Sequence, residues 1–357
     1  MRRFQNALPA RALKAAYSAG QAARILWHTG HYAAGRRIMG PLTEPGFVPD
    51  TEESGPLDRR RLRAAFFEIF QKDWENIEAG RYRMPLELQR PPLPSTIWRQ
   101  SRDYLRDTAK VARRKALRGH AEVRTETTKG RYPQYFLQNF HYQSDGWLSR
   151  ASAARYDMQV ETLFTGAAGA MRRAGLPAIG AGLAGKDAAR SRLLDLGCGA
   201  GTLLAEVKHN WPDLQVTALD LSPAYLGRAR TRLGRWKHIE YVQEKAEATG
   251  LSDASYDFIS CVYLFHELPP AIRRDVVREA ARLLKPGGLF ILVDTLQYGD
   301  EPGLDPLLRG FPRGFHEPYY DSYCRLALDN IFGSEGLVFQ NETLAFLSKV
   351  SLFQKPN

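Results

Sequence analysis

The residues Leu193–Thr202 combine an acidic side chain with three glycines at alternate positions. Asp195 ends an apolar run that we predict to be a strand, and a helix is predicted to begin at Leu203. The glycines between them are Gly197, Gly199 and Gly201. Glycine lets a backbone turn tightly and lets a ligand approach the main chain closely. In a doubly wound sheet, such a turn follows the first strand, at the edge where cofactors bind.

A second acid fits the same kind of site. Asp220 ends the next predicted strand, where a carboxylate can accept hydrogen bonds from both hydroxyls of a ribose. The alternative role of Asp220 is that of a helix cap or a surface acid. A dinucleotide is disfavoured as the ligand, because Thr202 replaces the third glycine of that fingerprint, which is needed for close helix packing.

Strands and helices alternate from residue 186 to residue 357, a pattern typical of a parallel sheet that helices cover on both faces. We predict an α/β fold with a Rossmann-like, doubly wound, seven-stranded sheet, an antiparallel edge strand and a basic helical N-terminal extension. Beyond the strand that ends near Asp195, the predicted strands span 215–219, 239–243, 257–262, 289–294, 337–341 and 345–353.

The acid and the glycine turn that follows it resemble motif I of class I S-adenosylmethionine (SAM) methyltransferases. The turn Lys285–Gly288, before the fifth strand, looks like a turn common in that class. The segment Cys261–Pro269, together with Tyr156 and Asp157, resembles the ubiquinone/menaquinone C-methyltransferase branch. The resemblance covers roughly residues 145–355, and it implies a methyltransferase that uses SAM as its cofactor.

The resemblance assigns the cofactor contacts to particular residues. They are Asp195, Gly197, Gly199, Gly201, Asp220, Leu221, Ala246, Glu247 and Tyr263. Asp195 would hold the methionine amine, and Asp220 would bind the ribose. Leu221 would flank the adenine ring and Glu247 would lie at its edge, while Tyr263 would lie near the methionine end.

Methyl transfer from a sulfonium requires the acceptor atom and the sulfur to lie in line, so positioning can supply much of the rate. A base is needed only where the acceptor atom carries a proton. The candidates follow the fourth and fifth strands, in loops of the kind that carry function: His266, His316, Glu317 and Tyr319. The alternative for His266 is a histidine satisfied by neighbouring backbone. Asn139, His141 and Tyr142 are candidates to line a lid.

The composition narrows the class of protein. Three scattered cysteines, Cys198, Cys261 and Cys324, fit neither a disulfide framework nor a zinc site. We therefore expect no metal and a reducing, cytoplasmic compartment. No apolar run has the roughly 20 residues that a membrane-spanning helix needs.

The net charge of +11 comes from the first half of the chain, because residues 186–357 are near neutral. Such asymmetry indicates a basic face that could meet phosphates or anionic lipid. The alternative is a solvated surface without an anionic partner. Residues 1–43 contain no acid, and they fit a targeting segment, an interfacial membrane helix or a helix packed on the rest of the chain. We favour packing or peripheral membrane contact.

The chain divides into three segments. They are a basic, mainly helical region (1–130), an aromatic lid with a cap helix and a linker (131–185), and the SAM-binding methyltransferase domain (186–357). Helices are predicted over 58–79 and 101–118. Ser149 is expected to cap a helix that runs toward Arg173, and a Gly/Ala-rich linker follows at 175–185.

We predict a SAM-dependent methyltransferase that acts on oxygen, nitrogen or carbon of a small-molecule or lipid-like acceptor. The first alternative is a nucleic-acid methyltransferase that holds phosphates with the basic N-terminal region. Against it, enzymes that methylate base amino groups resemble one another in an Asn/Asp-Pro-Pro-aromatic run, and Cys261–Leu264 stands in that place here. The second alternative is a non-catalytic SAM-binding partner, because a cofactor site does not itself show turnover.

Overall fold

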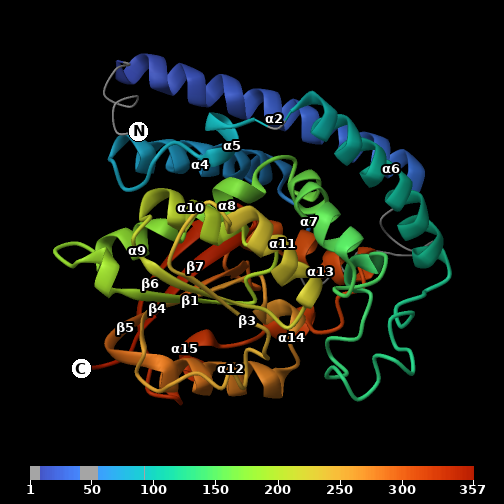
Figure 1. Ribbon diagram of the computed structural model, residues 1–357. Coiled ribbons are helices and arrows are strands. Elements are labelled where there is room, and N and C mark those ends of the chain that lie inside the picture. Colours follow the sequence, from blue (N-terminus) through green and yellow to red (C-terminus); the bar gives the residue numbers. More distant parts are fainter. Residues whose placement is uncertain (1–8, 41–54, 92) are drawn as a thin grey trace.

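A seven-stranded sheet, in the order β3-β2-β1-β4-β5-β7-β6, forms the centre of the molecule (Figure 1). The computed structural model describes residues 9–40, 55–91 and 93–357, without the side chain of Arg313. The strands are β1 (Arg192–Leu196), β2 (Gln215–Leu219), β3 (Ile239–Val242), β4 (Tyr256–Val262), β5 (Leu284–Thr295), β6 (Val338–Ala345) and β7 (Ser348–Gln354). Strands β1 to β5 pair in parallel, whereas β7 runs antiparallel to both β5 and β6. The predicted fold class is therefore confirmed.

Apolar side chains project from both faces of the central strands, because helices cover both faces of a parallel sheet. On β1, Leu193 packs with one hydrophobic cluster, while Leu194 and Leu196 pack with the other, and all three are fully buried. The first face carries α9 (Leu176–Gly182), α10 (Thr202–Asn210) and α11 (Pro223–Leu233). The second carries α12 (Pro270–Leu283), α14 (Tyr320–Cys324) and α15 (Leu328–Gly333). The two layers hold the carboxyl ends of the strands at one edge.

The Gly/Ala-rich stretch predicted as a linker contains helix α9. Leu176 and Ile179 of this helix are buried against the sheet. A Cβ at Gly182 would come within 2.4 Å of the Phe258 ring, and one at Gly175 within 3.0 Å of Val293. Its small residues therefore allow the helix to pack closely on β4 and β5, and do not mark a flexible connection.

The helix capped by Ser149 ends earlier than predicted. It splits into α7 (Arg150–Leu163) and α8 (Ala168–Arg173), because Gly166 lies between them with a φ of 90°. A Cβ at Gly166 would lie 3.4 Å from the backbone of Arg24. The break therefore lets the first N-terminal helix pass close to the chain.

The predicted turn Lys285–Gly288 is part of strand β5, at a point where the pairing of β5 with β4 is irregular.

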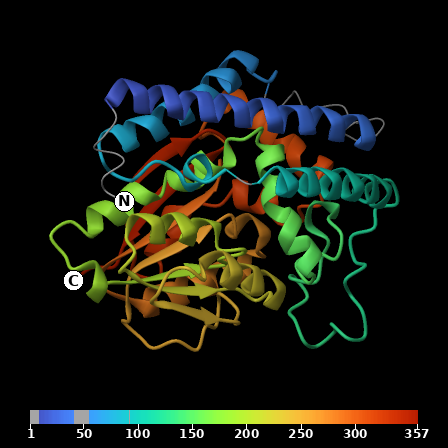
Figure 2. The ribbon, with the colours of Figure 1, turned by 45° about the horizontal axis from the view of Figure 1, so that its top comes forward.

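The N-terminal region folds as helices that pack on one another and on the rest of the chain (Figures 1 and 2). They are α2 (Ala10–Met39), α4 (Arg59–Glu78), α5 (Leu86–Gln89) and α6 (Pro94–Ala116). The predicted helices over 58–79 and 101–118 correspond to α4 and α6. Residues 1–8 and 41–43 of the acid-free segment lie outside the described residues. Within the described ranges, no helix is long and apolar enough to cross a membrane.

A buried ion pair joins these helices to the sheet layers. The Arg173 guanidinium of α8 donates two hydrogen bonds to Asp73 of α4, at 2.9 and 2.8 Å, and a third to Glu87 of α5 at 2.6 Å. The Tyr17 hydroxyl of α2 and the Tyr82 hydroxyl also donate to Asp73, at 2.7 and 2.6 Å. Because the Asp73 and Arg173 side chains are only 1% and 2% exposed, water cannot replace a lost partner.

We expect Asp73→Ala to lower the free energy of unfolding by about 3–5 kcal/mol, because it leaves a buried guanidinium without its main partner. Urea denaturation followed by circular dichroism measures this change. The matched control is Asp275→Ala, which breaks the exposed pair with Arg278 and should cost less than about 1 kcal/mol. Equal effects of the two substitutions would show that the buried pair does not hold the N-terminal helices in place.

Candidate active site

The glycine turn after β1 adopts a backbone that other residues rarely adopt. Gly197, Gly199 and Gly201 have φ values of 68°, 54° and 74°. A Cβ at Gly199 would meet only the Tyr225 ring, at 3.9 Å, so the backbone faces open space there. A Cβ at Gly201 would instead lie 3.1 Å from Ala229 of α11. Gly201 therefore serves the packing of α10 on α11, and the structure does not place it in the cavity.

A cavity of about 1080 Å³, which includes its open mouth, lies at the carboxyl ends of the strands, where the strand order reverses between β1 and β4. All the predicted cofactor residues except Gly201 line it: Asp195, Gly197, Gly199, Asp220, Leu221, Ala246, Glu247 and Tyr263. Its other wall is aromatic and comes largely from the segment before β1. Tyr135, Phe136, Phe140, Trp147 and Tyr156 form that wall.

Two buried acids lie at the glycine turn. The Asp220 carboxylate accepts the backbone N–H of Gly199 and that of Ser222, each at 2.8 Å. Burial raises the pKa of Asp220 to about 6. Asp195 accepts the Ser260 hydroxyl at 2.7 Å, and burial, with the Asp220 charge added, raises its pKa to about 7. A positively charged ligand would stabilise the ionised form of both acids.

One carboxylate oxygen of Glu247, in the same cavity, has no hydrogen-bond donor. One of its oxygens accepts the Tyr135 hydroxyl at 2.6 Å, and the other is buried without a hydrogen-bond partner. A buried acceptor of this kind is costly unless a ligand supplies the donor. An exocyclic amine, such as that of adenine, would do so. The cavity thus fits a cationic nucleoside. Its acids can accept the ligand's charged and hydroxyl groups, the open backbone at Gly199 allows close approach, and Glu247 can accept a hydrogen bond from the base.

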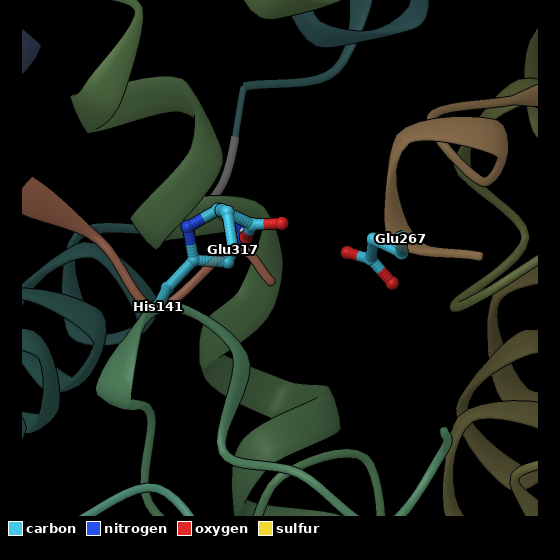
Figure 3. Close-up of side chains that lie close together, drawn as sticks. All are labelled: His141, Glu267 and Glu317. Atoms are coloured by element: carbon cyan, nitrogen blue, oxygen red, sulfur yellow. The ribbon is translucent and has the colours of Figure 1, made fainter. Parts of the chain in front are cut away.

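A second polar group lies beside the cavity: His141, Glu267 and Glu317, whose nitrogen and oxygen atoms all lie within 4.8 Å of one another. Glu267 comes from the 3-10 helix η3 (Phe265–Glu267), His141 from η1 (Phe140–Tyr142), and Glu317 from the loop between α13 (Asp305–Gly314) and α14. Figure 3 shows His141 and Glu317 side by side, with Glu267 facing them from another element. We call these three residues the His–Glu–Glu cluster.

Burial controls the protonation of this cluster. It raises the pKa of Glu267 well above its usual value, with the Glu317 charge adding to the effect. It raises the pKa of Glu317 to about 8 and lowers that of His141 to about 3. The sequence pointed to Glu317 as a catalytic candidate and to His141 as a lid residue. It missed Glu267, although this residue directly follows the predicted His266.

The other catalytic candidates do not line the cavity. His266 is buried, and its Nδ1 lies 2.6 Å from the Asp294 carboxylate. Burial alone would lower the pKa of His266, but Asp294 outweighs this effect and raises it to about 9. The His316 ring lies 2.7 Å from the Gln138 oxygen, and the Tyr319 hydroxyl accepts the Gln138 amide at 3.0 Å. His266 is still close enough for its charge to lower the pKa of Glu317.

A second cavity, of about 710 Å³ with its open mouth, lies between α2, α6 and α7. Its lining is apolar or uncharged for the most part: Tyr32, Met39, Tyr104, Thr108, Val111, His141, Gln143, Tyr156, Gln159, Val160, Leu163 and Phe315. Tyr156 lines both cavities, and His141 belongs to the cluster beside the first. Tyr156 is therefore a shared wall of the two cavities, and the His–Glu–Glu cluster contributes Glu267 to the first and His141 to the second.

Known proteins similar to this chain share its central part. A family profile described as "Methyltransferase domain" matches residues 193–288. A ubiquinone/menaquinone biosynthesis C-methyltransferase of Methylobacterium nodulans is 30% identical over 190 residues, 52% of this chain and 68% of the relative. A ubiquinone biosynthesis O-methyltransferase of Xanthomonas oryzae pv. oryzae is 33% identical over 149 residues, 40% of this chain and 59% of the relative.

Two solved structures are also similar. A putative sarcosine dimethylglycine methyltransferase from Galdieria sulphuraria has a TM-score of 0.40 and 16% identity, covering 56% of this chain and 88% of that one. The N-methyltransferase NodS of Bradyrhizobium japonicum, in complex with S-adenosyl-L-homocysteine, has a TM-score of 0.39 and 18% identity, covering 52% and 87%.

The chain belongs to the class I SAM-dependent methyltransferases. It is therefore an enzyme of the methyltransferase class, with SAM as its cofactor. The family match covers strands β1 to β4, from Leu193 on, and the glycine turn, whereas α2 to α6 lie outside it.

We expect SAM to bind more tightly as the pH rises from 5 to 8. The ionised carboxylates of Asp195 and Asp220, whose pKa values are raised to about 7 and 6, are the forms that accept its ammonium and hydroxyl donors. Protonation below those pKa values removes the acceptors, so the Kd at pH 5 should be about tenfold or more above that at pH 8. Isothermal titration calorimetry measures it, and a flat Kd over this range, with the fold intact, would contradict the assignment.

Proposed function

We propose that this protein transfers a methyl group from SAM to a small-molecule or lipid-like acceptor whose apolar part lies in the second cavity. The observation that carries the proposal is that the Tyr156 side chain lines both cavities, which places them side by side. An acceptor that enters between α2, α6 and α7 would bring its reacting end to the wall of the cofactor cavity. SAM, when bound, supplies the methyl group, which is activated by the positive charge on the sulfonium sulfur.

The chemistry of the second cavity supports an uncharged, apolar acceptor. None of its lining residues is lysine, arginine, aspartate or glutamate. A nucleic acid would need cationic side chains along its path, because phosphate contacts dominate such binding. The two relatives reported above are named for ubiquinone biosynthesis. An aromatic ring with an apolar tail is an acceptor of that kind, and its tail would fit between the helices while its ring reached the cluster.

The chain's own residues position the reaction. In our proposal Asp195, Asp220 and Glu247 hold the cofactor, and the aromatic wall that includes Phe140 and Trp147 excludes water from it. Tyr263 follows β4 with a φ of 55°, a strained backbone of the kind found at functional sites. Its hydroxyl lies 3.0 Å from that of Ser348, which fixes the ring at the cavity wall. Fixed walls of this kind supply the in-line alignment that methyl transfer needs.

We also propose that the N-terminal helices contact a lipid surface. Leu26 and Trp27 on α2 are 75% and 40% exposed, and Trp98 on α6 and Leu117, which follows it, are 65% and 71% exposed. The last turns of both helices are basic. Exposed tryptophan and leucine with basic neighbours suit the interface of an anionic bilayer. These helices also wall the second cavity, so an acceptor from the bilayer would enter it directly.

The direct test of the function uses SAM with an isotopically labelled methyl group. Purified protein is incubated with this SAM and a lipid and metabolite extract, and mass spectrometry finds the compound that gains the label. A labelled lipid or quinone-like compound would support the proposal. Label only in nucleic acid, or in no compound while SAM binds, would overturn it.

Filling the second cavity should weaken binding of the acceptor and leave binding of SAM unchanged. We expect Val160→Trp to raise the KM for the acceptor by about tenfold or more, because the ring occupies the space of the apolar part. The Kd of SAM should stay within about twofold, which also reports an intact fold. The matched control is Val338→Trp on the exposed strand β6. An unchanged KM in Val160→Trp would place the acceptor elsewhere.

Loss of the exposed apolar side chains should release the protein from membranes. We expect the double substitution Leu26→Ser and Trp98→Ser to reduce co-sedimentation with phosphatidylserine-containing vesicles by about tenfold or more, because two interfacial anchors are lost. Val338→Ser, at an exposed position on the sheet, is the control. If the wild type does not sediment with these vesicles, the proposed membrane contact is wrong, and the cavity proposal is unaffected.

A further inference from the structure

We propose that the His–Glu–Glu cluster is a binding site for one divalent cation, which holds the acceptor beside the cofactor. The three side chains come from different elements and converge from separate directions (Figure 3). Their ligand atoms lie within 4.8 Å of one another, which one ion with ligands at about 2.0–2.6 Å can span. This site was not expected from the sequence.

The state of Glu317 gives independent support. Its side chain is fully buried, and both carboxylate oxygens lack a hydrogen-bond partner. His141 Nε2 lies 3.0 Å from one of them, yet the pair does not have the alignment of a hydrogen bond. Two ligands about 2.1 Å from one ion, at a right angle to it, lie about 3.0 Å apart. The spacing therefore suits two ligands of a shared ion.

The local charge points to a cation as well. No lysine or arginine in the described part of the chain pairs with Glu267 or Glu317. His266 is a positive group whose charge acts on both glutamates, and it is already paired with Asp294 at 2.6 Å. Two carboxylates that share a buried space without a cation repel each other. A divalent ion would neutralise both and supply the missing partner of Glu317.

The ligand set suggests which ion binds. Carboxylates suit Mg²⁺, Ca²⁺ and Mn²⁺, and imidazole suits the transition metals, so a mixed set favours an ion such as Mn²⁺ that accepts both. Three protein ligands leave open positions on the ion. Glu267 lines the cofactor cavity and His141 lines the second cavity, so an ion held by both would lie between the two. An acceptor with two neighbouring oxygens, such as a catechol, could occupy them.

The role of the ion rests on the proposed function and makes it more specific. Coordination would favour loss of a hydroxyl proton of the acceptor to water. The lone pair of the resulting oxyanion then forms the O–C bond, the S–C bond breaks, and its electron pair stays on sulfur as the neutral thioether. The ion itself is neither oxidised nor reduced, and it is retained. The substrate class is therefore a hydroxylated aromatic ring with an apolar tail.

The test is metal binding by the full-length protein after treatment with EDTA. Titration with Mn²⁺, followed by calorimetry and by the electron paramagnetic resonance signal of the free ion, should show one ion per chain. Glu317→Gln and Glu267→Gln keep the side-chain shape and should each weaken binding by about tenfold or more. The matched control is Glu126→Gln, an exposed glutamate on a loop, which should bind Mn²⁺ as the wild type does.

SAM binding by each variant, measured in the same buffer, separates the possible failures. If SAM binds but the wild type takes up no ion at millimolar Mn²⁺, or both Gln variants bind the ion as tightly as the wild type, the cation site is overturned and the proposed function stands. If SAM does not bind to the wild type, the proposed function fails as well. A variant that binds SAM normally and has lost Mn²⁺ supports the site and excludes a general loss of fold.

Discussion

The hydrogen bonds of Asp220 hold the cofactor cavity in shape. One carboxylate accepts the N–H groups of Gly199 and Ser222, so the end of β2 is tied to the turn that follows β1. The turn itself needs glycine because its backbone is left-handed. A backbone hydrogen bond from the Cys198 N–H to the Leu219 carbonyl, at 2.9 Å, supports the same link between the turn and β2. The same carboxylate faces the cavity, so one side chain serves both the loop and the ligand.

The N-terminal helices complete the site from outside the family match. The buried pair of Asp73 and Arg173 fixes α4 against α8, and Tyr17 adds α2 to the same network. With α2 held in this way, α2, α6 and α7 enclose the second cavity. His141, which follows α6 in the chain, then meets Glu317 from the far end of the methyltransferase domain. The helices therefore wall a cavity next to the methyltransferase sheet and, in the proposed function, form its acceptor side.

Local patterns in the sequence predicted the sheet and most of the residues that the structure brings together around the first cavity. Asp195 and Asp220 were found because each ends an apolar strand, and strand ends meet at one edge of a parallel sheet. Composition misled at α9, where glycine and alanine mark close packing. The His–Glu–Glu cluster could not be read from spacing, because its members lie on two short 3-10 helices and a loop that only the tertiary fold brings together.

The two cavities are built from different parts of the chain, and this has an evolutionary consequence. The cavity assigned to the cofactor lies at the ends of the sheet strands, whereas most of the second cavity is built from helices before β1. If the second cavity takes the acceptor as proposed, substitutions on the inner faces of α2 and α6 would change which molecule is methylated and leave the binding of SAM untouched. New specificities can arise in this architecture by remodelling one helical layer, while the catalytic sheet is inherited unchanged.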